Sequence, residues 1–350
     1  MTQTIETEAL VIGAGPVGMY QAFQLGLLEI ETQIVDALPV AGGQPAEIYP
    51  GKPIYDLPGI PACTGEELAS ALLTQIEPLG QAMHLGQTVE ALERQADGRF
   101  LVGTRQGLSF LTRVVVLAAG IGAFEPKRLK LDGLERMPAD AVRYRVPPSV
   151  MANTRGHVVI IGGEDQALEA AIELAEQRSD QSDTGSTVTL VHRRDGFKAD
   201  EATVARFRDL CDSGAIHFQV GQATAFECGV DGRLETLEVT DPEMGVHLLA
   251  LNELWVLQGL SPKLGPVAQW SLAMERKQLL VDVERFQTSE AGIYAVGDVI
   301  TYPGKRKLLV CGFHEAVMAA FAVATQLRPD QPPQLQYTTT SPRLHELLGR

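Results

Sequence analysis

The chain has 350 residues, enough for two domains, and is 45% hydrophobic and 21% charged with 34 glycines, which is typical of a soluble globular protein. Its formal net charge of −15 argues against a general role in nucleic-acid binding, because phosphate contacts need a basic surface. There is no run of eighteen apolar residues, and the N-terminus MTQTIETE lacks a basic export signal, so we expect a cytoplasmic protein without membrane association.

Cysteine usage predicts neither a metal site nor a redox-active pair. The cysteines lie far apart and form no CxxC or metal-ligand spacing, so we expect buried or unreactive thiols and no bound metal. The four are Cys63, Cys211, Cys228 and Cys311.

Residues 8–36, EALVIGAGPVGMYQAFQLGLLEIETQIVD, predict a strand, a glycine turn, a helix and a second strand. Gly13, Gly15 and Gly18 form G-x-G-x-x-G, in which the glycines allow a tight turn, backbone approach to a pyrophosphate, and close helix–strand packing. Asp36 ends the second strand, where an acid accepts the ribose hydroxyls of FAD or NAD and repels the 2′-phosphate of NADP. A glycine-rich turn without a ligand is the alternative.

The same pattern recurs over residues 157–195. Gly162, Gly163 and Ala167 occupy the second turn, and an Ala/Leu-rich helix follows. Two βαβ units in one chain predict an α/β protein with two Rossmann-like nucleotide-binding domains of three layers (ββα).

Where the first unit has an acid after its second strand, the second unit has a basic cluster. Arginine has forked donors and a permanent charge, which suit a ribose that carries a 2′-phosphate; a solvated basic run is the alternative. The sequence therefore predicts FAD in the first domain, NADPH in the second, and hydride exchange between a nicotinamide and a flavin. The cluster consists of His192, Arg193, Arg194 and Lys198.

Glu164 stands where the second glycine of the second turn is expected. It could abolish NADPH binding, it could weaken binding by roughly 1–3 kcal/mol through repulsion of the phosphates, or it could turn outward and cap the helix dipole. Because the basic cluster is retained beside the altered turn, we favour a working site that still selects NADPH.

Later strand–turn patterns set the predicted domain limits. A buried strand ends in GAFEP (122–126), and the pattern AGIYAVGDVIT (291–301) followed by an apolar helix returns to the first domain. The first domain is therefore expected to be discontinuous. The predicted limits are 1–122 and 287–335 for the FAD-binding domain, 123–286 for the NADPH-binding domain, and 336–350 for a C-terminal extension.

Six segments in chain order resemble one known family, the thioredoxin-reductase-like ferredoxin/flavodoxin–NADP reductases of bacteria. The resemblance begins near residue 8 and extends to YTTTSP (337–342), and YPGKPIYD and GDVITYPGK are its most specific parts. The segments are GGQPAEIYPGKPIYDLPG, GAFEP, HRRDGFK, GLSPKLGP, AGIYAVGDVITYPGKRKL and GFHEA.

The resemblance implies that four residues of the N-terminal segment contact FAD. Asp36 would hold the adenosine ribose, and Val89 would meet the adenine through its backbone. Gln44 would contact the flavin region, and Tyr49 would stack on one face of the isoalloxazine, with an ordinary loop aromatic as the alternative.

Four further residues follow from the same resemblance. Phe124 would line the flavin pocket, unless it is a buried hinge residue, and Asp298 would lie against the ribityl chain and pyrophosphate. Thr339 and Thr340 match a C-terminal extension that covers the other flavin face, partly across the interface of a homodimer.

The resemblance also implies how electrons leave the flavin. Residues 121–200 contain no cysteine, whereas thioredoxin reductases carry a CxxC pair there, so we expect direct transfer to ferredoxin or flavodoxin. Lys305–Lys307 and the group Lys127, Arg128 and Lys130 are candidate docking surfaces for such an acidic carrier, with solvated surface as the alternative.

The predicted function is that of a ferredoxin (flavodoxin)–NADP(+) reductase. Two alternatives remain open: an NADPH diaphorase for another acceptor, such as a quinone, a nitroaromatic or a ferric chelate, and a non-catalytic FAD-binding regulatory protein. No nucleophile–base pair is expected.

Overall fold

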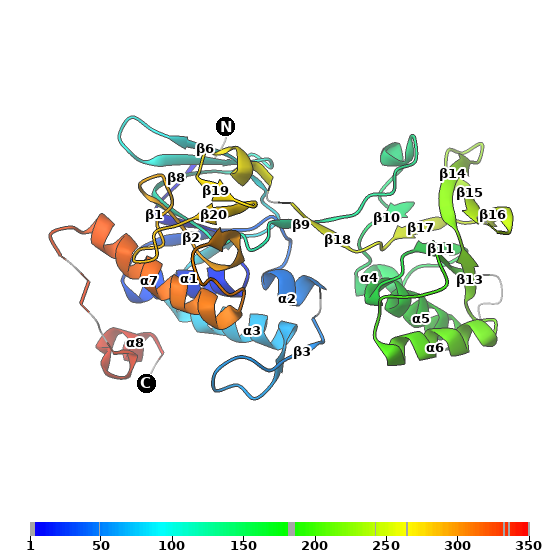
Figure 1. The fold of residues 1–350 in the computed structure, drawn as a ribbon, viewed down its shortest axis with the longest axis horizontal. Helices are drawn as coiled ribbons and strands as arrows, with labels where there is room; N and C mark the ends of the chain where they lie inside the picture. Colours follow the sequence, from blue (N-terminus) through cyan, green and yellow to red (C-terminus); the bar gives the residue numbers. More distant parts are fainter. Residues whose placement is uncertain are drawn as a thin grey trace. The chain divides into compact units, whose positions relative to one another are not determined.

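The computed structural model describes residues 4–48, 50–180, 186–241, 243–263, 265–331, 333–334 and 337–348. The chain divides into two compact units (Figure 1): unit 1, Met1–Phe124 with Pro262–Arg350, and unit 2, Glu125–Ser261. The chain returns to unit 1 at residue 262, whereas the sequence placed this return at 287. Strand β20 (Gln278–Leu280), which precedes the predicted return, pairs with β22 (Ile300–Thr301), and a contact between such distant segments is not visible in the local pattern.

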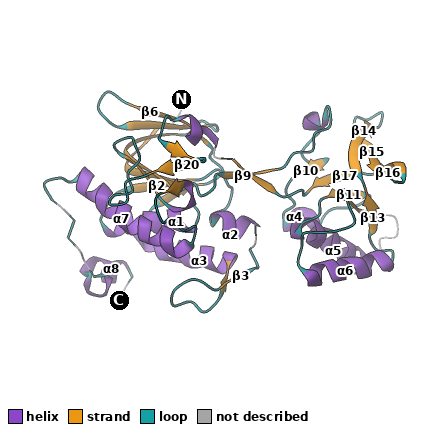
Figure 2. Cartoon of the chain, viewed as in Figure 1, coloured by secondary structure: helices purple, strands orange, loops and turns teal. Residues whose placement is uncertain are grey.

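Unit 1 is built on a seven-stranded sheet in the order β5-β2-β1-β8-β7-β6, with β21 beside β8. The strands β5, β2, β1, β8 and β21 are parallel, whereas β6 and β7 add an antiparallel part next to β8. This mixed sheet is covered by helices (Figure 2). The strands are β1 (Thr4–Ile12), β2 (Thr32–Val35), β5 (Ala82–His84), β6 (Val89–Arg94), β7 (Phe100–Thr104), β8 (Ser109–Leu117) and β21 (Ile293–Ala295).

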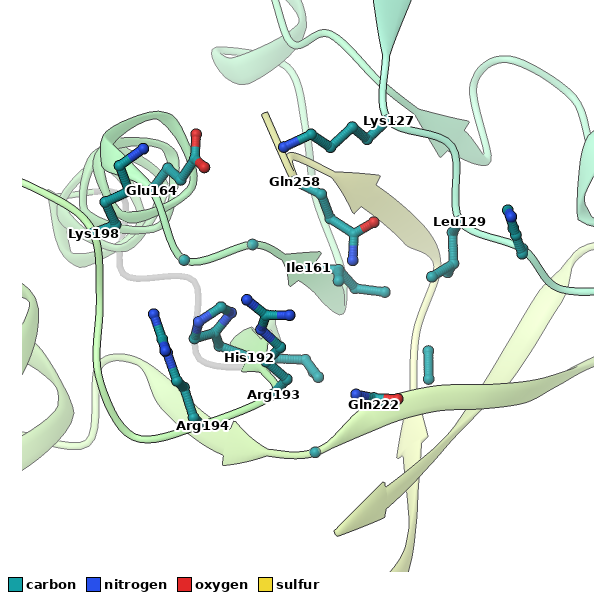
Figure 3. Close-up of a pocket in the computed structure, with 16 residues that line it drawn as sticks. Lys127, Leu129, Ile161, Glu164, His192, Arg193, Arg194, Lys198, Gln222 and Gln258 are labelled. Carbon is teal, nitrogen blue, oxygen red and sulfur yellow. The ribbon is translucent and has the colours of Figure 1, made fainter. Parts of the chain in front are cut away.

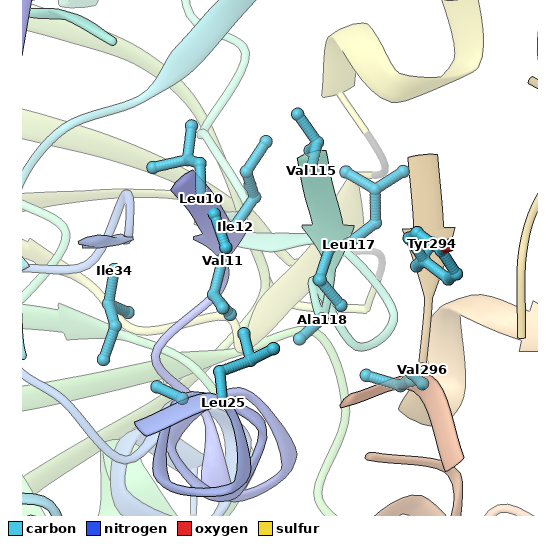
Figure 4. Packing of buried hydrophobic residues seen from close by; sticks show 14 of the residues in the cluster. Leu10, Val11, Ile12, Leu25, Ile34, Val115, Leu117, Ala118, Tyr294 and Val296 are labelled. Atoms are coloured by element: carbon cyan, nitrogen blue, oxygen red, sulfur yellow. The ribbon is translucent and has the colours of Figure 1, made fainter. Parts of the chain in front are cut away.

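The core of unit 1 forms where the central strands meet the helices (Figure 4). Leu10 and Val11 of β1 and Leu117 of β8 have no exposed surface, because parallel strands are covered on both faces. The main helices are α1 (Pro16–Leu27), α2 (Gly43–Ile48), α3 (Gly65–Ile76) and α7 (Leu309–Leu327). A capping box begins α3: Glu67 N–H donates to Thr64 Oγ1 (3.1 Å), and Thr64 N–H donates to Glu67 Oε2 (2.8 Å).

Helix α7 is the one described helix that is long and apolar enough to cross a membrane by length and composition alone. Gly312, Ala316, Ala319 and Ala320 on one of its faces are buried, and small residues there let α7 pack closely on α1. We interpret α7 as a core helix of unit 1 on the basis of this buried face.

Unit 2 has a five-stranded parallel sheet in the order β10-β17-β11-β12-β13 and a three-stranded antiparallel sheet, β14-β15-β16. Both units therefore have the α/β, Rossmann-like architecture that the sequence predicted. The elements are β10 (Val142–Arg143), α4 (Pro148–Met151), β11 (Val158–Ile161), α5 (Asp165–Asp180), β12 (Val188–His192), α6 (Glu201–Asp212), β13 (His217–Val220), β14 (Gln222–Cys228), β15 (Leu234–Asp241), β16 (Gly245–Ala250) and β17 (Glu253–Val256).

The remaining elements are short. Strands β9 and β18 pair with each other where the chain passes between the units, and β3 pairs with β4 in unit 1. Their bounds, with those of the other short strands and the last helix, are β3 (Pro53–Ile54), β4 (Cys63–Thr64), β9 (Ala123–Pro126), β18 (Leu260–Lys263), β19 (Met274–Glu275) and α8 (Pro342–Leu347).

Candidate nucleotide-binding sites

The two glycine turns are equivalent in hydrogen-bond register. Gly13 N–H donates to Val35 O (2.8 Å) in unit 1, and Gly162 N–H donates to Val191 O (3.1 Å) in unit 2. Counting from these pairs, Asp36 corresponds to His192, and Gly15 corresponds to Glu164. The residues that the sequence singled out in the two units therefore occupy matching places.

Packing explains two of the three glycines in the first turn. Gly13 has φ +117°, and a Cβ there would collide with Ala118 O; a Cβ at Gly18 would collide with Gly13 O. Gly15 differs, because the nearest atom to a Cβ built on it is the Cα of Gly43, at 3.8 Å. A Cβ at Gly15, at the N-terminus of α1, would thus make an ordinary van der Waals contact without a clash.

Asp36 braces this turn. Its Oδ2 accepts from Ala14 N–H (2.5 Å), and its Oδ1 accepts from Leu38 N–H (2.7 Å). Burial raises the pKa of the Asp36 carboxyl, and the two backbone hydrogen bonds oppose that shift. A carboxylate has about four lone-pair sites, so it can accept further hydrogen bonds from ribose hydroxyls.

Segments far apart in sequence meet around this turn. A Cβ at Gly43 would lie 2.7 Å from Gly15 Cα, which places Gln44, at the start of α2, beside the turn. Gln87 N–H donates to Asp36 O (2.8 Å), which brings the segment leading to the buried Val89 to the end of β2.

The turn that contains Asp298 approaches from the C-terminal part of the chain. Cβ atoms built on Gly297 and Gly312 would both contact the side chain of Val17, in the first turn of α1. The structure therefore gathers Asp36, Gln44, Val89 and Asp298 around one glycine turn.

Other predicted flavin residues are not gathered there. Tyr49 lies outside the described residues, and Phe124 lies in β9 with a side chain that is not described. Thr339 and Thr340 are exposed in the 3-10 turn Thr338–Thr340.

The C-terminal extension is anchored to α1 at its C-terminal end. Arg343 Nη1 donates to Gly26 O (3.1 Å) and lies 3.4 Å from Glu29 Oε1. Gly26 is eleven residues after Gly15, about 16 Å along the helix. Within one chain, the extension therefore lies at the opposite end of α1 from the glycine turn.

The sequence reasoning missed a buried ion pair in unit 1. Glu315 has no exposed surface; its Oε2 accepts from Gly297 N–H (2.8 Å), and its Oε1 accepts from Tyr302 Oη–H (2.8 Å) and Lys305 Nζ (2.5 Å). Burial and the adjacent Glu315 carboxylate raise the pKa of Tyr302. A lone glutamate in the apolar run GFHEAVMAAFAVATQL was the available signal, because a buried charge needs a partner.

This pair corrects one sequence interpretation. The Lys305 side chain is only 5% exposed, so Lys305 is not part of a docking surface; Arg306 and Lys307 beside it are exposed.

Unit 2 contains a cavity of about 480 Å³ at its glycine turn (Figure 3). Five cationic side chains line this cavity, and Glu164 is the one acid among the described lining residues. Lys127 and Lys130, which the sequence suggested as part of a docking patch, thus line this cavity. The cations are Lys127, Lys130, Arg193, Arg194 and Lys198.

His192 closes over the second turn. A Cβ at Gly163 would collide with the imidazole of His192, and this ring stacks on Phe197 with centroids 5.8 Å apart. Burial, and then the charges of Arg193 and Arg194, lower the pKa of His192. The imidazole is therefore neutral near pH 7 and forms one wall of the cavity.

Glu164 lies in the second glycine turn, beside the segment that follows β17. Its backbone forms a bridge with Lys198, and its Oε2 would be 2.7 Å from a Cβ built on Gly259. In Figure 3 its carboxylate points to the side of the cavity where Lys127 lies and away from Arg193 and Arg194. The carboxylate thus lines the cavity, on the side across the turn from the arginine pair.

Neither unit contains a recognisable metal centre within the described ranges, where no three His, Cys, Asp or Glu side chains converge. The four cysteines are all free thiols.

Residues 7–320 match the pyridine nucleotide-disulphide oxidoreductase family, and the chain belongs to this family. It is 49% identical over 346 residues to a ferredoxin–NADP reductase of Polaromonas naphthalenivorans (strain CJ2), covering 99% of this chain and 93% of that relative. A ferredoxin–NADP reductase of Albidiferax ferrireducens is 50% identical, with 99% and 96% covered. These relatives confirm the resemblance seen in the sequence.

Solved structures support the fold. Lactococcus lactis thioredoxin reductase matches with a TM-score of 0.62 at 23% identity, covering 93% of this chain and 100% of that chain. The Bacillus cereus bacillithiol disulfide reductase matches with a TM-score of 0.63 at 15% identity, covering 92% and 99%. Both structures resemble this chain in their two-domain fold alone.

Proposed function

We propose that this protein is a ferredoxin–NADP reductase that moves a hydride between NADPH and FAD and single electrons between the flavin and ferredoxin. The observation that carries the proposal is the pair of equivalent glycine turns with opposite charges at the strand ends, Asp36 in unit 1 and Arg193 with Arg194 in unit 2. FAD, when bound, supplies the conversion between two-electron and one-electron transfer.

In unit 1, the FAD pyrophosphate would lie at Gly15, at the N-terminus of α1, where a Cβ built on the glycine would meet no clash. Asp36 would hold the adenosine ribose with the lone pairs that its two backbone hydrogen bonds leave, and the backbone at Val89 would border the adenine. Gln44 and Asp298 would orient the rest of the cofactor. Roles of Tyr49, Phe124, Thr339 and Thr340 at the flavin remain predictions from the resemblance.

In unit 2, the cavity fits the adenosine end of NADPH. Arg193, Arg194 and Lys198 would bind the 2′-phosphate through charge-assisted hydrogen bonds, while Gly162 and Gly163 bring the backbone close to the pyrophosphate. The neutral His192 imidazole would position this end of the nucleotide and exclude water beneath it.

The thiols favour direct electron transfer over disulfide exchange. No two of the four cysteines are bonded, and burial, with the Glu67 carboxylate, raises the pKa of Cys63. A thiol with a raised pKa is a poor nucleophile for disulfide exchange. The electrons would therefore pass from the flavin edge to a docked carrier.

Arg306 and Lys307 are the exposed cations that we assign to docking of ferredoxin, with flavodoxin as a second carrier. The assembly as a homodimer, the cytoplasmic location and the lack of membrane association belong to this proposal as well.

The test is anaerobic reduction of purified ferredoxin by NADPH with the FAD-loaded protein, followed by ferredoxin absorbance. We expect rapid reduction, and a lower rate at low ferredoxin concentration for Arg306→Gln/Lys307→Gln. The double variant Arg136→Gln/Arg233→Gln removes equal charge from exposed positions of unit 2 and should keep the wild-type rate. Fast NADPH oxidation by a quinone without ferredoxin reduction would favour the diaphorase, and no NADPH turnover with any acceptor would favour a regulatory protein.

A further inference from the structure

The second glycine turn carries a charged side chain where the first has Gly15. A Cβ built on Gly15 would make an ordinary van der Waals contact without a clash, so packing against a Cβ does not account for this glycine. In unit 2 the same place carries Glu164, directly before α5. Glu164 lines the cavity, so its carboxylate is placed to act on a ligand bound there.

The position of the carboxylate defines which part of a nucleotide it can affect. Glu164 Oε2 and Lys127 Nζ would lie 2.7 Å and 3.4 Å from the same Cβ position on Gly259, so the two charged groups are at most about 6 Å apart, the sum of these distances. This side of the cavity lies across the turn from Arg193 and Arg194 (Figure 3).

In a Rossmann-like fold, the pyrophosphate lies at the N-terminus of the helix after the glycine turn. That helix is α5, which begins directly after Glu164. The carboxylate therefore faces the pyrophosphate end of a bound dinucleotide, and the arginine pair faces the 2′-phosphate end. Lys127 offsets part of the negative charge beside the pyrophosphate.

The charge distribution has a consequence for affinity. A cavity with five cations beside a helix N-terminus attracts any compound with a pyrophosphate, including NAD and other nucleotides. A negative charge at the pyrophosphate weakens all of these ligands, while a 2′-phosphate on the arginine pair restores affinity only for NADP(H).

We propose that Glu164 sets the affinity of this site: its carboxylate weakens binding of the pyrophosphate of every dinucleotide, so that tight binding depends on the 2′-phosphate at Arg193 and Arg194. This inference rests on the proposed NADPH site and names the residue that lowers its affinity for dinucleotides.

The test is calorimetric titration of the FAD-loaded protein with NADP⁺, NAD⁺ and 2′-AMP. Glu164→Gln removes the charge, and Glu164→Gly removes the whole side chain. Both variants should tighten NADP⁺ and NAD⁺ binding by a similar factor of about five to thirty. Binding of 2′-AMP, which has no pyrophosphate, should stay within twofold of wild type. Glu173→Gln removes the same charge from an exposed position on α5 and should change none of the three.

Other results would overturn the inference. Unchanged or weaker NADP⁺ and NAD⁺ binding in Glu164→Gln, or an equal gain for 2′-AMP, would show that the carboxylate does not act at the pyrophosphate. Failure of wild type to bind both NADP⁺ and 2′-AMP would instead contradict the proposed function. The isosteric Gln variant carries the test if Glu164→Gly folds poorly.

Discussion

The two glycine turns have equivalent backbone hydrogen bonds but differ in how the charged groups around them are placed. In unit 1 the charges near the turn are held inside: Asp36 bonds two backbone N–H groups, and the buried Glu315 pairs with Lys305 and Gly297. In unit 2, Arg193 and Arg194 are exposed toward the cavity. Charges of unit 1 should therefore determine stability and FAD retention, and charges of unit 2 should determine which nucleotide binds.

The largest expected effect is on the buried ion pair of unit 1. Lys305→Met leaves the fully buried Glu315 carboxylate without its cation, which should lower the free energy of unfolding by about 3–5 kcal/mol. Denaturant unfolding of the variant beside wild type measures the loss. The matched change at the exposed neighbour, Lys307→Met, should have little effect, and equal loss in both variants would refute a structural role for the pair.

The next effect concerns the brace of the first turn. Asp36→Ala leaves the N–H groups of Ala14 and Leu38 without their acceptor, which should cost about 2–4 kcal/mol and release FAD. Flavin fluorescence after gel filtration, together with unfolding, measures both losses. The exposed Asp330→Ala is the control. Full FAD retention in Asp36→Ala, with unchanged unfolding, would show that Asp36 neither braces the turn nor holds FAD.

In unit 2, the matching experiment should change affinity without changing stability. Arg194→Ala removes a charge-assisted contact to the 2′-phosphate and should weaken NADP⁺ binding by about tenfold to a hundredfold. Binding of NAD⁺ and the unfolding midpoint should remain as in wild type. Calorimetric titration measures the affinity for both ligands, with Arg136→Ala as the charge control. An equal loss of affinity for NAD⁺ would show that Arg194 does not bind the 2′-phosphate.

The smallest effect is a pH dependence at His192. Its pKa is lowered in the free protein by burial and by the two arginines, and a bound 2′-phosphate offsets their repulsion and favours the protonated ring. Binding should therefore take up a proton, so the affinity advantage of wild type over His192→Gln for 2′-AMP should grow about threefold to tenfold as pH falls from 8 to 5.5.

Titration of both proteins across this range isolates the histidine, because protonation of the phosphate affects both alike. A constant ratio of the two affinities would mean that His192 does not respond to the ligand.

Much of the fold and of the two candidate sites could be predicted from the sequence, because both depend on local sequence patterns. The strand–turn–helix repeats around Gly13 and Gly162 predicted two Rossmann-like units, and similar solved structures confirmed this fold. The partners of Glu315 and the inclusion of Lys127 in the cavity could not be predicted, since they depend on contacts between distant segments. The return of the chain to unit 1 at residue 262 was missed for the same reason.

Glu164 shows the limit of motif reasoning most clearly. The sequence marked it as a departure from the glycine pattern with three interpretations, whereas the structure places the carboxylate in the cavity lining, beside Gly259 and Lys127. The direction of a side chain is set by its surroundings and cannot be read from spacing alone.

The most direct test of two nucleotide sites with opposite charge preference is anaerobic stopped-flow reduction of the bound flavin. Stoichiometric NADPH should bleach the flavin absorbance rapidly, and NADH should do so far more slowly, because only NADPH carries the 2′-phosphate that Arg193 and Arg194 would bind. Equal rates with both nucleotides, or no bleaching with either, would contradict the account.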